Sequence, residues 1–467
     1  MPGGDHRRGG CVRARTPRAE EHIHVDGRVT LSGTSKLFAA ALLVALAATS
    51  MRAQRADSAL IPARPKLDPG VDTNSAQANY EYGMKRIYDS PIESLRAFYW
   101  ASRIDPSSGD AMYALWTAKL IAMSDSDIIS YFKHGSAKRA PGQLALDSLI
   151  SRAYAINPFL FSSIDGALMR RRIEAAIYLA FPKMPIGEQE QIVSGKMRAA
   201  EYQPDIAYAE GHFQKALNAY AFELDLNSDS NRVLPKKTKW KPNAKEKEWI
   251  QLMKVASAYW QVDIHAKRAR IFYHIHELDS ASTEMITAIS ILQAQDSGAA
   301  QLLYMSKAIF DQSLGMIYER DRRPELAREA YGHALQEDLS YYAAHGRLAE
   351  LGLEQGDTTI ALSEMDLAVQ LDPKDPALRY RYAEVLVSAR RDAEAAQQLI
   401  RAIALDPYYG APHLLLAMMS DVENYTDDAI AQYQSYVALA ARSDPQLPRI
   451  KARLAKLTSS VASTQPH

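Results

Sequence analysis

Three histidines and a glutamate form the first candidate for metal chemistry in this sequence. His265, His274, His276 and Glu277 are residue types that bind Zn²⁺. On a helix, His274 and His276 would lie two positions apart and point about 160° away from each other, so they could not share one ion. The H-E-x-x-H pattern is also absent. We interpret these histidines as surface or core residues and predict no metal site.

Signatures of phosphate binding and of nucleophilic catalysis fail on spacing. Gly187 and Gly195 lie too far apart for a phosphate-binding loop, and Met197 follows Lys196 where Ser or Thr would be needed. The sequence contains no G-x-S-x-G pattern, and its single cysteine is Cys11. We therefore predict no catalytic residue, no cofactor and no enzymatic activity.

Aromatic side chains are concentrated in "RAFYWASR" and "MYALWTA", within residues 96–118. Aromatic residues at helical spacing generally belong to a hydrophobic core. An alternative function remains open, in which residues 79–249 form a helical enzyme or bind a carbohydrate or another small ligand between these rings.

The balance of charge argues against a polyanion-binding protein. The chain has 55 basic and 55 acidic side chains, and the first 53 residues hold eight of the former and four of the latter. Without that segment the chain would carry 47 basic and 51 acidic groups. Nucleic-acid-binding domains normally carry a basic excess, so no nucleic-acid partner is expected.

The N-terminus has the composition of an export signal. "LFAAALLVALAAT", residues 37–49, is an uncharged apolar run preceded by Arg28 and Lys36 and followed by small residues. A run of this length is too short to span a bilayer comfortably, so we expect cleavage near Ser50 or after Ala53 and no permanent membrane span. Translation starting near Val29 would give a more compact signal. These features predict an exported bacterial protein, periplasmic or extracellular.

The second half of the chain has a fixed sequence period without insertions. A small residue recurs at equal intervals at Gly315, Ala349, Ala383 and Ala417, and an alanine recurs twelve residues later in each unit. A large apolar residue follows four positions after that alanine. Small residues at fixed positions allow two helices to approach closely, and bulk there would push them apart.

Residues at the expected helix boundaries agree with this period. Asp392 and Thr426 stand where an N-cap should open a second helix, and Asp375 is predicted to cap the start of a first helix.

This pattern resembles the tetratricopeptide repeat, whose unit is a pair of antiparallel helices and whose period equals the interval from Gly315 to Ala349. The resemblance implies an all-α fold, an α-solenoid of stacked antiparallel helix pairs that curves into a right-handed superhelix. It is strong from Val262 onward and weaker upstream, where "SPIESLRAFYWASRIDP", "LDSLISRAYAINP" and "EGHFQKALNAYAFELDL" are predicted second helices.

The domain organisation predicted from these patterns has seven segments. They are a leader with a signal peptide (1–53), a flexible linker (54–75), a degenerate repeat-like helical region (76–226), a polar lysine-rich loop (227–249), a helical repeat-like unit with an extension (250–307), four consecutive repeat units (308–441), and a capping helix with a disordered tail (442–467).

In the family that the sequence resembles, the first helices of the units line a concave groove that takes a peptide or a partner helix. The resemblance therefore implies a scaffold or adaptor that binds a protein or peptide, with envelope assembly or secretion as its setting; it implies no oligomeric state. Carried over by register, the groove-facing residues are Gln312, Met316, Glu319, Arg347, Glu350, Tyr380, Arg381, Glu384, Leu414 and Met418.

Overall fold

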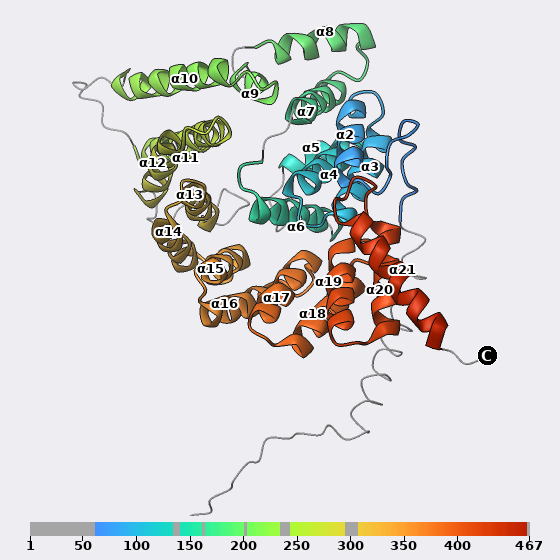
Figure 1. Ribbon diagram of the computed structural model, residues 1–467. Helices are drawn as coiled ribbons and strands as arrows, with labels where there is room; N and C mark the ends of the chain where they lie inside the picture. Colours follow the sequence, from blue (N-terminus) through green and yellow to red (C-terminus); the bar gives the residue numbers. More distant parts are fainter. Residues whose placement is uncertain are drawn as a thin grey trace, which may run out of the picture. The chain divides into compact units, whose positions relative to one another are not determined.

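The computed structural model describes residues 61–133, 141–160, 164–199, 203–233, 243–294 and 307–464. Within these residues the chain forms twenty α-helices and no strand (Figure 1), so the all-α prediction is confirmed. The helices belong to one compact unit, Pro62–His467.

The helices of the first half are α2 (Ala76–Arg86), α3 (Pro91–Ile104), α4 (Gly109–Ile121), α5 (Asp125–Lys133), α6 (Pro141–Ile156), α7 (Ile164–Ala180), α8 (Ile186–Met197), α9 (Gln203–Ala209) and α10 (Phe213–Val233). Those of the second half are α11 (Ala244–His274), α12 (Leu278–Ala294), α13 (Ala308–Arg320), α14 (Pro324–Glu337), α15 (Tyr342–Glu354), α16 (Thr358–Leu371), α17 (Pro376–Ser388), α18 (Asp392–Leu405), α19 (Gly410–Val422), α20 (Thr426–Leu439) and α21 (Leu447–Thr464).

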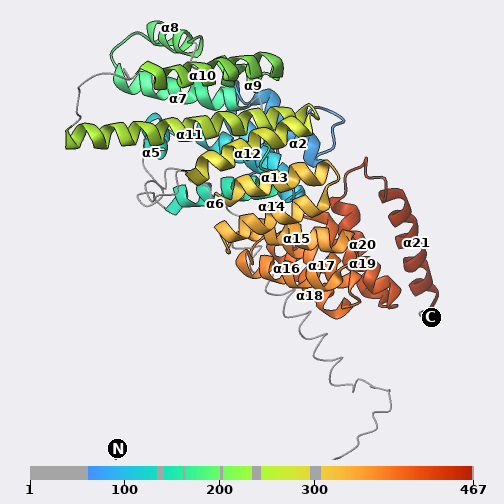
Figure 2. The ribbon, with the colours of Figure 1, turned by 90° about the vertical axis from the view of Figure 1, so that its left-hand side faces the viewer.

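Helices α13 to α20 form four antiparallel pairs whose first and last residues recur with the period of the sequence. Figure 2 shows α11 to α18 as successive layers of the stack. The small-residue positions make this packing possible. A Cβ atom on Gly315 would collide with the ring of Tyr331 on the second helix of the pair, and Ala349, Ala383 and Ala417 are fully buried at the equivalent positions.

The turn inside each unit has one recurring backbone conformation. Arg322, Gly356, Arg390 and Asn424, which occupy equivalent positions of the four units, have φ values of 58°, 78°, 62° and 61°. The next backbone N–H donates to a carbonyl near the end of the first helix, for example Arg391 N to Leu386 O at 2.8 Å. This is the left-handed helix ending known as the Schellman motif.

The predicted helix starts are partly wrong by one residue. Asp392 and Thr426, expected as N-caps, are instead the first helical residues, because the left-handed turn ends one position earlier. Asp375 does act as the cap of α17, since its carboxylate accepts hydrogen bonds from Ala377 N and Leu378 N at 2.8 and 3.1 Å.

The first half contains a helix pair with the same packing chemistry. In α2 and α3, a Cβ atom on Gly83 would lie 2.5 Å from the ring of Phe98. Ser94, Phe98 and Ala101 are fully buried, as the repeat pattern predicts. Trp100 and Tyr113 are also buried. The rings of the two aromatic motifs therefore belong largely to the core, which weakens the alternative of a carbohydrate pocket between them.

Two predicted segments differ from the structure. Residues 227–249 were expected to form a loop, but α10 extends to Val233 and α11 begins at Ala244; the positions between lie outside the described residues. Alanine, lysine and glutamate favour helices even in polar sequence. Part of the expected flexible linker is packed, because the indole of Trp100 donates to Pro62 O at 3.0 Å and Arg64 lies over the same ring.

The C-terminal helix covers the last repeat. Leu447, Ile450 and Leu457 of α21 are buried in one cluster with Tyr433 and Tyr436 of α20. The apolar side of α21 therefore packs against α20. Among the described residues, no helix is both long and apolar enough to cross a bilayer; the run at 37–49 lies outside them.

Candidate functional site

The predicted groove residues lie on α13, α15, α17 and α19, the first helices of the four units. Figure 1 shows α6 on the inner side of the arc that these helices belong to. Two of the predicted groove residues, Gln312 and Arg347, contact the first half of the chain, and Met316, Glu319, Glu350 and Arg381 contact these two residues or each other. Tyr380, Leu414 and Met418 line an open cavity, and Glu384 contacts Tyr380.

The end of α6 occupies the groove at the first two units. Gln312 is fully buried, and its amide donates to Ala155 O at 2.6 Å. The hydroxyl of Tyr341 donates to the same side chain, and Met316 is buried beside it. Gln312 and Met316 are therefore already satisfied within the chain.

A row of ion pairs extends from this contact along the groove. Arg347 donates to Ile156 O at 3.3 Å and lies 3.1 Å from Glu350 and 3.8 Å from Glu319. Glu350 also binds Arg381 at 2.6 Å. Burial opposes ionisation of Glu350, but Arg347 and Arg381 outweigh it and lower the pKa of this carboxyl. The four charges neutralise one another inside the molecule.

Two further ion pairs hold the first half of the chain against the repeats. Arg152 of α6 lies 3.1 Å from Asp375. Arg103 of α3 lies 2.9 Å from Asp406, which has a nearly buried side chain. Burial raises the pKa of Asp406 to about 6, although Arg103 opposes the shift. Next to this pair, the rings of Trp100 and Tyr408 meet edge to face at 4.8 Å.

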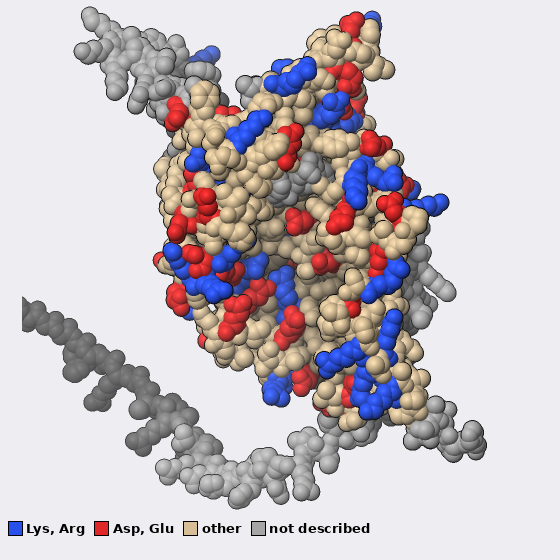
Figure 3. Space-filling view, turned by 45° about the horizontal axis from the view of Figure 1, so that its top comes forward, with Lys and Arg blue, Asp and Glu red and all other residues tan. Residues whose placement is uncertain are grey.

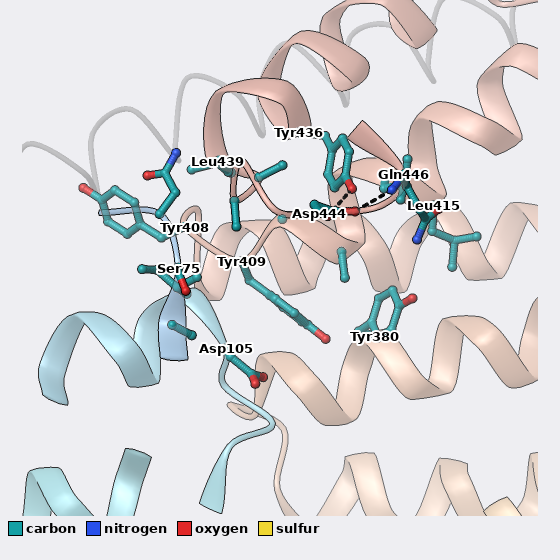
Figure 4. Close-up of a pocket in the computed structure, with 18 of the residues that line it drawn as sticks. Ser75, Asp105, Tyr380, Tyr408, Tyr409, Leu415, Tyr436, Leu439, Asp444 and Gln446 are labelled. Carbon is teal, nitrogen blue, oxygen red and sulfur yellow. Dashed lines mark hydrogen bonds between the residues drawn. The ribbon is translucent and has the colours of Figure 1, made fainter. Parts of the chain in front are cut away.

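Beyond these contacts the groove opens into a cavity of about 460 Å³. Tyr380, Leu414 and Met418, three of the predicted groove residues, line it, and Figure 4 shows Tyr380 near Tyr409 in this lining. The first half of the chain contributes Asn74, Ser75, Ala76, Ile104 and Asp105, and the last repeats contribute Tyr408, Tyr409, Gly410, Ala411, Leu415, Tyr436, Leu439, Ala440, Ala441, Asp444 and Gln446. A second cavity, of about 230 Å³, lies near Arg347 and Arg381.

Aromatic and carboxylate groups determine the chemistry of the larger cavity. The rings of Tyr380 and Tyr409 meet at 5.5 Å with an angle of 70° between their planes. Burial, and after it the neighbouring Glu384 carboxylate, raise the pKa of Tyr380, so its hydroxyl stays protonated at neutral pH. Met418, 45% exposed, contributes an accessible apolar side chain. The cavity can take an apolar or long side chain from another molecule.

The lining from the first half of the chain was missed by the sequence analysis. Its residues precede the array by hundreds of positions, so no repeat register places them. In the sequence, the two tyrosines of "ALDPYYG" could have indicated the cavity, because a turn between repeats does not itself require two adjacent aromatic residues.

The histidines of the metal hypothesis have separate partners. His265 Nδ1 lies 2.6 Å from Glu284, His274 Nε2 lies 2.9 Å from Phe159 O, and Arg320 contacts His276. Among the described residues, no three His, Cys, Asp or Glu side chains form a group that could hold a metal ion. Each of the three histidines therefore has a structural role in the contacts described.

Residues 352–419, which run from the second to the fourth unit, match the family model of the tetratricopeptide repeat. This segment of the chain carries tetratricopeptide repeats. Proteins built from these repeats are generally scaffolds that bind proteins or peptides and are typically non-catalytic. An uncharacterized protein of Haemophilus influenzae is 30% identical over 111 residues, which cover 24% of this chain and 62% of that protein. The chain thus spans less than two thirds of this relative.

Several solved tetratricopeptide structures are similar at low identity. The C-terminal part of a repeat-containing protein from Cytophaga hutchinsonii is 15% identical, covering 52% of this chain and 79% of its own, with a TM-score of 0.37. YrrB, described as having an unusual peptide-binding site, is 16% identical, covering 43% of this chain and 97% of its own, with a TM-score of 0.33. Yeast Tom70 is 11% identical, covering 83% of this chain and 90% of its own, with a TM-score of 0.37. Such TM-scores do not establish a common three-dimensional arrangement.

Proposed function

We propose that this tetratricopeptide protein is an exported scaffold that binds a segment of another protein in the open, C-terminal part of its groove. The observation that carries the proposal is the cavity between Tyr380, Leu414 and Met418, where the chain itself does not fill the concave face. Gln312 and Arg347 then have a different role, which is to hold the first half of the chain in place. Met316, Glu319, Glu350 and Arg381 contact these two residues or each other.

The surface at the mouth of the cavity supports contact with a protein. Met418 lines the cavity and is 45% exposed, and Val422, one turn further along α19, is 80% exposed. Accessible apolar groups next to a concave site are typical of interaction surfaces. The face in Figure 3 instead shows acidic and basic side chains interspersed, which fits recognition by a local site better than by bulk charge.

Site-specific photo-crosslinking in cells tests this proposal. A photoreactive amino acid placed at Met418 should give adducts with another protein, because the side chain borders the cavity and is accessible. Leu367 on α16 is a matched control, since it is apolar and similarly exposed, 43% against 45%, but does not line the cavity. Equal adducts from both positions, or none from Met418, would contradict the proposal.

Export is part of the proposal and has its own test. The apolar run at 37–49 should direct the chain through the inner membrane, after which envelope assembly or secretion is the natural setting for a scaffold. Mass spectrometry of the protein from fractionated cells should find a periplasmic or extracellular form whose N-terminus lies near Ser50 or just after Ala53. A full-length form held firmly in the inner membrane would be incompatible with it.

A further inference from the structure

We propose that the cavity at Tyr380 accepts a lysine or arginine side chain of the bound protein segment. This inference rests on the proposed function and names the partner chemistry of the same site.

The lining carries negative charge without positive charge. Asp105 and Asp444 are its two charged residues, and no lysine, arginine or histidine is among the described residues that line it. Asp105 comes from the end of α3 and Asp444 from the segment before α21, and Figure 4 shows them at different ends of the lining, Asp105 near Tyr409 and Asp444 beside Tyr436. A cation between them would gain attraction from both.

Both carboxylates are held in position by groups of the same chain. Asp444 accepts a hydrogen bond from the Tyr436 hydroxyl at 2.5 Å and another from Gln446 N at 2.8 Å. Asp105 accepts from Ser107 N at 3.0 Å and from the Ser107 hydroxyl at 2.5 Å, and both of these bonds end on Oδ1. Carboxylates fixed in this way need little rearrangement to bind a donor.

The arginines near the cavity bind other residues of the chain. Arg103 pairs with Asp406 at 2.9 Å, and Arg381 pairs with Glu350 at 2.6 Å. Arg442 lies 3.8 Å from Asp72. Arg103, Arg381 and Arg442 offset carboxylates outside the lining. Arg64, a further cation nearby, donates to Thr73 O at 2.7 Å and to the side chain of the lining residue Asn74 at 3.0 Å, so it is held at the edge of the cavity.

The apolar part of the lining suits the stem of a long basic side chain. Lysine and arginine carry several methylene groups below the charge, and Leu414, Leu415 and Met418 can cover them. The Tyr380 and Tyr409 rings add faces that attract cations. A carboxylate ligand would meet two carboxylates and no cationic partner in the same space, so an acidic segment or a chain terminus fits poorly.

Selection from a display library of random peptides on the full-length protein tests the inference. Selected peptides should be enriched in lysine or arginine at one position. Replacing that residue by norleucine, which keeps the stem and removes the charge, should weaken binding about tenfold, the usual order for a charge-assisted contact. The Asp105→Asn, Asp444→Asn double variant should lose most of this discrimination. The asparagine at position 105 can still accept both bonds from Ser107 through one oxygen. The asparagine at position 444 can accept from Gln446 N, and its amide would donate to the Tyr436 hydroxyl in place of the bond that the carboxylate accepts.

The control variant is Glu329→Gln, which removes an exposed carboxylate on α14 that does not line the cavity. It should discriminate between the lysine and norleucine peptides as the unaltered protein does. Peptides that need Met418 for binding but show no preference for a cation, or prefer an acidic residue, would overturn this inference and leave the proposed function standing. Failure to select any peptide whose binding depends on Met418 would count against both.

Discussion

At the scale of single residues, the turn inside each repeat needs a left-handed backbone conformation, and different units place different residue types at that position. The left-handed region costs roughly 1–2 kcal/mol for residues with a Cβ atom, and glycine avoids this cost. Gly356 occupies the position in one unit, but Arg390 occupies it in the next with φ 62°. Arg390→Gly should therefore stabilise the protein by up to about 1 kcal/mol, measured by urea denaturation.

The reciprocal change gives the control. Space around Gly356 is open, so a Cβ atom there would meet no neighbour within 4 Å. Gly356→Ala should consequently destabilise the protein by about 1 kcal/mol through backbone strain alone. If both variants shifted the denaturation midpoint in the same direction, the conformational explanation would be wrong.

At the scale of helices, the repeats depend on close approach at their alanine positions. Ala395 on α18 is fully buried, in one cluster with Ala383, Leu386 and Leu399. Ala395→Leu should lower the free energy of unfolding by roughly 1–3 kcal/mol because the extra methyl groups overfill this space. Gln397→Leu places the same side chain on the exposed side of the same helix and should change stability by less than about 0.5 kcal/mol. Similar losses from both would refute tight packing at Ala395.

At the scale of the whole molecule, contacts between distant segments add to the stacking of neighbours. In a simple solenoid each unit contacts only the next, and damage stays local. Here Arg152 of α6 binds Asp375 at the start of α17, and the side chain of Asp375 is only 2% exposed. Arg152→Ala leaves that carboxylate without its cation, so we expect a loss of roughly 1–3 kcal/mol.

The same variant distinguishes the two modes of coupling. Hydrogen exchange should show weaker protection in both α6 and α17, because the ion pair joins them. Lys374→Ala, next to Asp375 in the sequence and exposed, is the control and should leave both helices protected. Loss confined to α6 would mean that the repeats behave as a simple linear stack.

The sequence by itself determined the repeat architecture, because the forces that produce it are local. Gly315, Tyr331 and their equivalents recur once in every unit, and each pair of helices needs only its own small and large residues to pack. Propensity and turn chemistry were less decisive at boundaries. They did not predict that both ends of the 227–249 segment are helical. They also predicted Asp392 and Thr426 as N-caps, whereas both are the first residues of their helices.

What occupies the groove was decided only by the tertiary structure. Gln312 and Arg347 have the register of groove residues, yet they bind Ala155 O and Ile156 O, groups more than 150 positions away in the sequence. The lining of the cavity likewise combines Asp105 and Asp444, which lie far apart in the sequence. A repeat pattern carries information about neighbouring helices, whereas these contacts depend on how the first half of the chain folds back on the array, which no local spacing encodes.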